Sequence, residues 1–277
     1  MLSSERKGPL CMFAASVCWS FGGLCIKFIP WGAMSIIGLR ALLAAIVFAV
    51  YQRGFKLKFT FGNVLAALAL SATTMLFVFA NKLTTAAAAI LLQFTSPIFI
   101  ILINLLFYRQ KPKASELIAV SAALCGMLLF FADRLEAGNS LGNLLAIGSG
   151  LAFAGVFVCN KRPDTNPEQS LLLGFLINAA IGVPFAFVEA TADPVAWASV
   201  LFLGIVQVGL AYVLFSIGIK STSALLANLM SAMEPVLNPV WVALVTGEVP
   251  SNFALAGGAV IITAVVGYNV WEARHST

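Results

Sequence analysis

The residues best suited to chemistry in this chain are polar side chains that interrupt long apolar stretches. Arg40 and Glu234 are charged, and each lies near the middle of a stretch long enough to cross a bilayer. A charge at the bilayer centre costs about 2.5–3.5 kcal/mol on insertion scales, so both side chains should face the interior of a helix bundle. There a guanidinium could bind a carboxylate, and a carboxylate could carry a proton or bind an amine.

Each charged residue also has a purely structural interpretation. Arg40 could clamp the bundle by bonding backbone carbonyls or by pairing with Glu234, or it could bind a substrate carboxylate. Glu234 could be the partner of Arg40, a proton carrier or a contact for a substrate amine. Burial alone favours the protonated acid and a nearby arginine favours the carboxylate, so the sequence leaves the choice open.

Five uncharged polar or aromatic residues also fall near mid-span. The three amides could bond helix to helix or contact a ligand, since a buried amide in lipid must find partners. The tryptophan and tyrosine could simply pack, or they could form an aromatic wall that suits an amine ligand through cation–π contact. Together with the two charged residues they form our candidate substrate-binding set: Trp19, Arg40, Gln93, Asn178, Gln207, Tyr212 and Glu234.

The residues that most enzymes use are sparse. The one histidine, His275, is in the C-terminal tail, and the five cysteines lie inside apolar runs without metal-ligand spacing. We find no phosphate loop, no Ser-His pair and no paired aspartates. The sequence therefore predicts no catalytic residues, no metal site and no cofactor, and we expect that the protein is not an enzyme.

Composition identifies the class of protein that must position these residues. The chain has 277 residues, of which 61% are hydrophobic and 10% charged, whereas soluble domains carry about a quarter charged residues. We predict an all-α membrane protein, because about 20 apolar residues suffice to cross the hydrocarbon core. The ten predicted spans are Pro9–Lys27, Trp31–Tyr51, Phe61–Ala80, Thr84–Phe107, Ala114–Ala132, Leu141–Cys159, Gln169–Val188, Pro194–Ile219, Ser221–Val245 and Asn252–Trp271.

The placement of positive charge predicts the orientation. With ten spans, twelve Lys and Arg residues fall on the side of the amino terminus. The other side holds three, which are Lys27, Lys82 and Arg134. The positive-inside rule therefore places both termini in the cytoplasm.

The two halves of the chain resemble each other. Residues separated by 138 positions match in Lys82 and Lys220, in Thr84 and Thr222, and in two proline pairs, Pro97 with Pro235 and Pro112 with Pro250. We therefore expect two repeats, at 1–136 and 137–277, and five helices in each would give them inverted topology. Inverted repeats are typical of transporters with a midplane site, where prolines can free backbone groups. We predict helix kinks at Pro97 and Pro235.

Several stretches carry a resemblance to a known family. They are WSFGGLCIKF in the first span, GLRALLAAIVF in the second, ALLANLMSAMEPVLNPVWVALVTGEVP across the ninth and GGAVIITAVVGYN in the tenth. In these stretches the chain resembles the ten-helix EamA-type branch of the drug/metabolite transporter superfamily, including bacterial amino acid and metabolite exporters. Arg40, Glu234-Pro235 and Gly247-Glu248 match the family pattern, whereas Arg109-Gln110 departs from it.

The resemblance implies a secondary transporter in the bacterial plasma (inner) membrane that exports or exchanges a small metabolite, such as an amino acid, by alternating access. Transport could be coupled to protons, and the protein would be a monomer or a homodimer. Its expected partners are the small-molecule substrate and the lipid bilayer, and we expect no nucleic acid. One alternative is a multidrug or organic-cation exporter, which an unpaired Glu234 beside Trp19 and Tyr212 would favour. A less favoured alternative is a receptor or scaffold that transports nothing.

Overall fold

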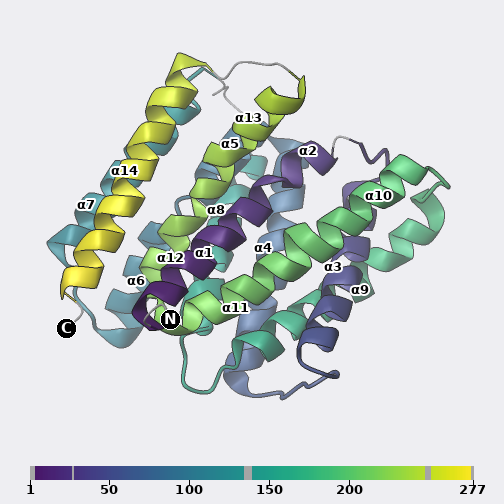
Figure 1. The fold of residues 1–277 in the computed structure, drawn as a ribbon, viewed down its shortest axis with the longest axis horizontal. Helices are drawn as coiled ribbons and strands as arrows, with labels where there is room; N and C mark the ends of the chain where they lie inside the picture. The colour runs from purple at the N-terminus through teal and green to yellow at the C-terminus, as the bar shows by residue number, and fades with distance from the viewer. Residues whose placement is uncertain (1–3, 27, 134–138, 247–250, 276–277) are drawn as a thin grey trace.

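A computed structural model describes residues 4–26, 28–133, 139–246 and 251–275, and the regular elements in these segments are helices (Figure 1). The predicted Gly247-Glu248 motif, Pro250, Lys27 and Arg134 lie outside the described residues. In chain order the helices are α1 Ser4–Ser20, α2 Gly22–Ile26, α3 Ala33–Tyr51, α4 Phe61–Leu83, α5 Ala86–Gln93, α6 Ser96–Tyr108, α7 Ala114–Phe130, α8 Ser140–Cys159, α9 Pro167–Glu189, α10 Pro194–Phe202, the π-helix η1 Leu203–Leu210, α11 Ala211–Ser221, α12 Ala224–Ser231, α13 Met233–Thr246 and α14 Asn252–His275.

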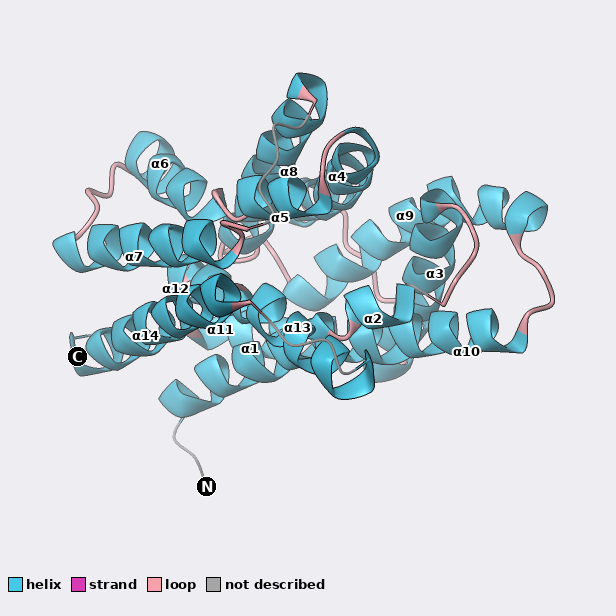
Figure 2. Cartoon of the chain, turned by 90° about the horizontal axis from the view of Figure 1, so that it is seen from above, coloured by secondary structure: helices cyan, strands magenta, loops and turns pink. Residues whose placement is uncertain are grey.

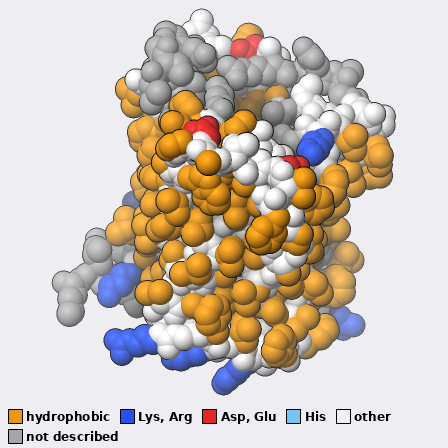
Figure 3. Space-filling view, turned by 90° about the vertical axis from the view of Figure 1, so that its right-hand side faces the viewer, with side chains coloured by type: hydrophobic (Ala, Val, Ile, Leu, Met, Phe, Trp, Pro, Cys, Tyr) orange, Lys and Arg blue, Asp and Glu red, His pale blue; other side chains and the backbone are white. Residues whose placement is uncertain are grey.

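The described helices confirm a membrane protein of the all-α class. Seven of them, some continuing across a short break, are long and apolar enough to cross a bilayer, and 114–130 and 224–237 are shorter apolar helices. Figure 3 shows hydrophobic side chains covering most of one face, with Lys and Arg gathered at its lower edge. This belt is what a lipid-facing surface requires. The count of ten spans and the side on which the termini lie remain predictions.

Four of the predicted spans contain an interruption. The first is divided into α1 and α2, and the eighth runs from α10 through η1 into α11. The fourth and ninth are broken just before a proline: Pro97 lies in the first turn of α6 and Pro235 in the first turn of α13. A proline is tolerated in a first turn because its missing N–H has no intrahelical acceptor there.

Helix packing follows a two-repeat pattern. Helices α3 and α9 pack on each other, and so do α7 and α14, each pair joining equivalent positions of the two halves. Other contacts repeat between the halves. Helix α4 packs on α8 in the way that α11 packs on α1, and α4 packs on α9 in the way that η1 packs on α3. Helices of each half therefore pack mainly on the other half, and the central space is enclosed by both.

The loops gather at two ends of the bundle. At one end, which we call the basic end, the α3–α4 and α8–α9 loops meet, as the hydrogen bond from Thr60 Oγ1 to the Asp164 carbonyl shows. At the opposite end the start of α3 meets the α9–α10 loop, where Trp31 Nε1 donates to Thr191 Oγ1, and the end of α4 meets α8, where Thr84 Oγ1 bonds Asn143 Oδ1.

Candidate functional site

A cavity of about 470 Å³ lies between the two halves. All seven candidate residues line it, although they come from seven different elements of the chain. Pro235 also lines the cavity, whereas Pro97 is buried and is not among the lining residues. The sequence prediction therefore brought together residues that share one space, and whether they bind a substrate remains a prediction.

The two charged residues face this cavity without a direct partner. Neither the Arg40 guanidinium nor the Glu234 carboxylate forms a hydrogen bond or an ion pair with any described residue. The structural interpretation in which Arg40 and Glu234 form a clamp is therefore absent from this conformation. Both groups remain available to a ligand or to water in the cavity.

Aromatic rings form part of the wall. Trp19 and Tyr212 meet edge to face with ring centroids 5.1 Å apart, and Phe175 packs against Tyr212 at 5.3 Å. The indole Nε1 of Trp19 is buried and has no hydrogen-bond partner. A buried indole N–H usually finds an acceptor, so this unpaired donor is an exception in the wall.

The three amides differ in what they bond. Gln93 Nε2 donates to Ser149 Oγ at 2.8 Å, so this amide joins α5 to α8. Gln207 Nε2 donates to the Trp19 carbonyl at 3.2 Å, while its Oε1 has no partner, and Asn178 Oδ1 has none either. Buried polar groups are nearly always paired, so the unpaired and buried oxygens of Gln207 and Asn178 are exceptions in residues that line the cavity.

The repeat relation separates shared from unshared features of the site. Tyr212 lies 138 positions after Thr74, in the register of the Lys82–Lys220 match, so these are equivalent positions with different side chains. The counterpart of Glu234 is Ser96, which is buried and bonded to Asn228 Oδ1 at 3.0 Å. The charge of Glu234 is therefore found where the two halves differ.

The cavity reaches the opposite end of the bundle. Its lining includes Ile26 at the end of α2, Ala33 at the start of α3, and both Asn81 and Lys82 in the last turn of α4. Figure 2 views the chain from above Figure 1, with α4 and α8 on one side and α2, α3 and α10 on the other. Lys82 is exposed at this mouth.

Toward the basic end, aromatic packing closes the cavity. Phe48, Phe157 and Phe215 are fully buried, and Phe157 packs against Phe215 at 5.3 Å. On its own helix, each of the three lies between cavity-lining residues and the basic end. A layer of packed rings without polar groups is a barrier to water and to polar solutes.

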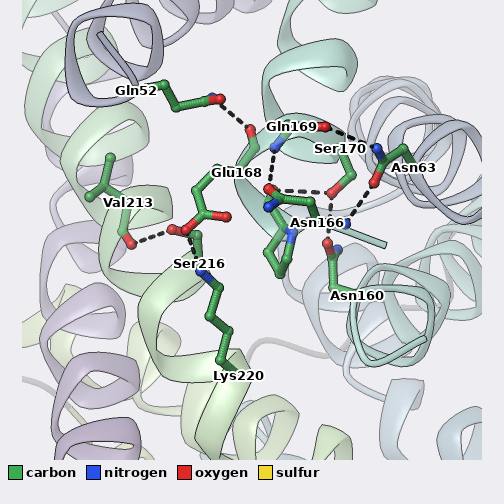
Figure 4. A network of polar contacts seen from close by, with 11 residues as sticks. Gln52, Asn63, Asn160, Asn166, Glu168, Gln169, Ser170, Val213, Ser216 and Lys220 are labelled. Carbon is green, nitrogen blue, oxygen red and sulfur yellow. Dashed lines mark hydrogen bonds and ion pairs between the residues drawn. The ribbon is translucent and has the colours of Figure 1, made fainter. Parts of the chain in front are cut away.

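A polar network closes the basic end beyond that layer (Figure 4). Helix α9 begins at its centre: the Asn166 N–H donates to Asn63 Oδ1, the Glu168 carbonyl accepts from Gln52 Nε2, and Ser170 Oγ donates to Asn160 Oδ1. Lys220 at the end of α11 forms an ion pair with Glu168. The start of α9 is thus bonded to α3, α4, α8 and α11.

The α8–α9 loop adds two electrostatic features outside the spanning helices. Asp164 accepts from Arg162 Nε at 2.9 Å and from the Gly62 N–H at 2.8 Å. The bond from Arg162 is the main cause that lowers the pKa of Asp164 below its usual range. Lys161 donates from Nζ to the Ile219 carbonyl at 3.0 Å, and partial burial lowers the pKa of its ammonium.

Sequence reasoning missed one wall of the cavity, which belongs to α4. Thr73, Phe77 and Asn81 line it at intervals of four residues, and Thr74 and Val78 repeat that interval one position later. Residues four apart share a helix face, so this spacing was the available signal. The hydroxyls of Thr73 and Thr74 bond carbonyls of their own helix, so α4 presents a mildly polar wall.

Comparisons with known proteins agree with this architecture. The sequence profile of the EamA-like transporter family matches residues 6–132 and again 140–270. An uncharacterized transporter of Archaeoglobus fulgidus is 26% identical over 70% of this chain and 71% of its own length, and the uncharacterized inner membrane transporter YicL of Salmonella typhimurium is 24% identical over 85% and 86%. A solved crystal structure with 20% identity has a TM-score of 0.82 and covers 98% of this chain and 99% of that chain.

Proposed function

This chain belongs to the EamA-like transporter family and is a multi-pass membrane transporter, and we propose that it exports or exchanges a small metabolite such as an amino acid by alternating access. The observation that carries the proposal is a single cavity holding Arg40 and Glu234, neither of which is neutralised by a direct partner among the described residues. Two unpaired charges of opposite sign are complementary to a small molecule that carries both an acid and an amine.

Each group has a role in the proposed binding step. The Arg40 guanidinium binds the substrate carboxylate, for which its fork of donors is suited. The substrate ammonium pairs with the Glu234 carboxylate, which lines the same cavity as Arg40. The apolar part of the substrate packs on Trp19 and the rings beside it.

The transport step follows from the closure of one end at a time. In the conformation described here, the cavity opens beside Lys82 and is closed toward the basic end by aromatic packing and the Figure 4 network. The positive-inside rule assigns the basic end to the cytoplasm. Export then requires the converse state, in which the basic end opens to take up substrate and the Lys82 mouth is closed. Glu234 couples this exchange to protons if it binds one in only one of the two states.

A specific observation also favours the second candidate, an organic-cation exporter. The edge-to-face contact of Trp19 and Tyr212 leaves an aromatic wall beside an unpaired carboxylate, which is an arrangement suited to a hydrophobic cation. The two candidates differ in what they require of Arg40. An amino acid gains a partner there, whereas a monovalent cation meets a like charge.

Purified protein in liposomes tests the proposal. The liposomes are loaded in turn with labelled amino acids, with the corresponding amides and decarboxylated amines, and with hydrophobic cations, and efflux is measured with and without a pH gradient. We expect flux of at least one amino acid above that of its amide and its amine. Flux confined to cations supports the second candidate, and absence of flux for every solute contradicts both.

A further inference from the structure

The basic end of the bundle is held by an ion pair between two helix ends. Glu168 lies in the first turn of α9 and pairs with Lys220 in the last turn of α11. The carboxylate is mostly buried, with 13% of its side chain exposed, and the ammonium is 51% exposed. A carboxylate at a helix start interacts favourably with the helix dipole, so Glu168 is stabilised by α9 as well as by Lys220.

The opposite end also contains a lysine at the end of a helix and a carboxylate at the start of another, but these two do not form an ion pair. Lys82 lies 138 positions before Lys220 and occupies the last turn of α4, as Lys220 occupies that of α11. The start of α3 corresponds to the start of α9, but α3 has no acidic residue in its first turn. The carboxylate there comes from the other half: Glu189 Oε2 accepts from the Gly32 N–H at 2.8 Å and from Ser35 Oγ.

Glu189 therefore supplies at the start of α3 the charge that Glu168 supplies at the start of α9. Glu189 lies beside the start of α3, where Ala33 lines the cavity, and Lys82 lines the same cavity from the last turn of α4. Lys82 has no ion pair with any residue that the structure describes, and Glu189 and Lys82 are both exposed. The other described acidic residue near the start of α10, Asp193, already caps that helix by accepting from the Val195 N–H.

We propose that Lys82 and Glu189 form the ion pair that closes the cavity mouth when the Lys220–Glu168 pair opens. This inference rests on the alternating access proposed above. In the state described here the pair at the basic end is made and the pair at the mouth is broken. In the converse state, α4 approaches the start of α3 and the two pairs exchange.

Replacing one ion pair by the other keeps the two states close in free energy. The ammonium of Lys220 is half exposed and both Lys82 and Glu189 are exposed, and ion pairs that solvent reaches are individually weak, so neither pair should lock the protein in one state. Because one pair forms as the other breaks, their contributions largely cancel between the two states. The equilibrium between states then stays close enough to balance for a bound substrate to shift it.

The test measures accessibility of the cavity from each side. Thr74 lines the cavity and is replaced by Cys as the reporter, in protein reconstituted in vesicles of known orientation. The native cysteines are first replaced by Ala at Cys11, Cys18, Cys25, Cys125 and Cys159. A membrane-impermeant maleimide is added from one side or the other, and the measured quantity is the ratio of labelling rates, Lys82 side over basic side.

The two ends predict effects of opposite sign. Lys82→Gln and Glu189→Gln should each raise the ratio by roughly 1.5-fold to fivefold, the range expected of an exposed pair. Glu189→Gln retains an oxygen that can accept from Gly32, so it removes the charge with little other change. Lys220→Gln, the matched control at the equivalent position, should lower the ratio by a similar factor.

Charge exchange distinguishes a pair from two independent charges. Lys82→Glu combined with Glu189→Lys should return the ratio toward that of the parent, whereas independent sites would give additive effects. A second measurement is disulfide formation between Lys82→Cys and Glu189→Cys, which should block labelling from the Lys82 side.

The outcomes separate the pair from the transport cycle. An unchanged or lowered ratio in Lys82→Gln, together with a lowered ratio in Lys220→Gln, would overturn the Lys82–Glu189 pair and leave alternating access standing. Failure to label the reporter from the basic side in the parent and in every variant would show that the cavity opens to one side only. That result would contradict alternating access itself and the proposed pair with it.

Discussion

Gly38 and Gly182 bring the backbones of α3 and α9 into direct contact near the middle of the molecule. A Cβ atom built on Gly38 would lie 2.2 Å from the Gly182 carbonyl carbon, and one built on Gly182 would lie 2.6 Å from the Gly38 Cα. These distances are too short for any side chain without movement of a helix. The contact therefore fixes how closely the two halves approach beside the Arg40 position.

Gly38→Ala should destabilise the protein, since overpacking a tight contact typically costs about 1–3 kcal/mol. The same change at Gly267 is the control, because a Cβ there meets nothing within 4 Å and alanine favours a helix. Thermal unfolding of the detergent-purified variants measures both. We expect Gly38→Ala to lower the Tm and Gly267→Ala to leave it unchanged or raise it. Equal effects in the two variants would show that the α3–α9 contact adjusts freely.

Much of this fold was predictable from the sequence because bilayer dimensions limit the solutions. Apolar stretches of about 20 residues separated by short polar loops leave a helix bundle as the natural arrangement. The interruptions before Pro97 and Pro235 followed from proline chemistry. The π-helix η1 did not, because no proline marks it; within it, Gly204 packs closely against Leu43 of α3.

The sequence indicated which residues line the cavity, but not which of them have hydrogen-bond partners. Their binding of a substrate stays a prediction. Polar residues near the middle of a span are costly in lipid and should face the bundle interior, and the residues selected on this ground line one cavity. Which of them have partners depends on helices distant in sequence: Gln93 bonds Ser149 on α8, while an equally polar Gln207 keeps a free oxygen. The wall formed by α4 was missed because threonines are common in apolar helices, where their hydroxyls bond carbonyls of the same helix, and so they do not stand out as candidate ligand contacts.

Arg40→Gln should weaken binding of an acid substrate much more than binding of its amide. Charged hydrogen bonds contribute about 1.5–3 kcal/mol, so the acid should lose roughly tenfold or more in affinity. Lys56→Gln is the control, because Lys56 is an exposed cation in the α3–α4 loop and does not line the cavity. Isothermal titration of both variants with the acid and the amide gives the comparison. Equal losses for acid and amide in Arg40→Gln would instead support a structural clamp.

Glu234→Gln should abolish flux driven by a pH gradient while retaining exchange of substrate for substrate. The amide keeps the size and the hydrogen-bonding oxygen of the carboxylate but cannot bind and release a proton. Asp133→Asn serves as the control, since it removes an exposed carboxylate that does not line the cavity. The measurement compares gradient-driven and exchange flux in proteoliposomes. Unchanged pH dependence in Glu234→Gln would remove the proton-carrying role.

The loop pair Arg162–Asp164 should make stability depend on acidity. The pKa of Asp164 is lower in the folded protein than in the unfolded chain, chiefly because Arg162 bonds its carboxylate. The unfolded chain therefore binds its proton at a higher pH, and the stabilisation is present above the ordinary aspartate pKa, near 3.9, and lost as the pH falls through the lower folded value. The effect should be small because Asp164 lies at the surface.

Asp164→Asn tests this linkage, since asparagine keeps an oxygen for the Gly62 N–H but does not titrate. The Tm of the parent should fall more steeply than that of the variant between about pH 5 and pH 3, the range that includes the aspartate pKa. Arg162→Gln should also reduce the slope, though less than Asp164→Asn does, because it removes the largest cause of the lowered pKa of Asp164 and leaves the bond from the Gly62 N–H. A slope in Arg162→Gln equal to that of the parent would assign the acid dependence to the Gly62 bond instead.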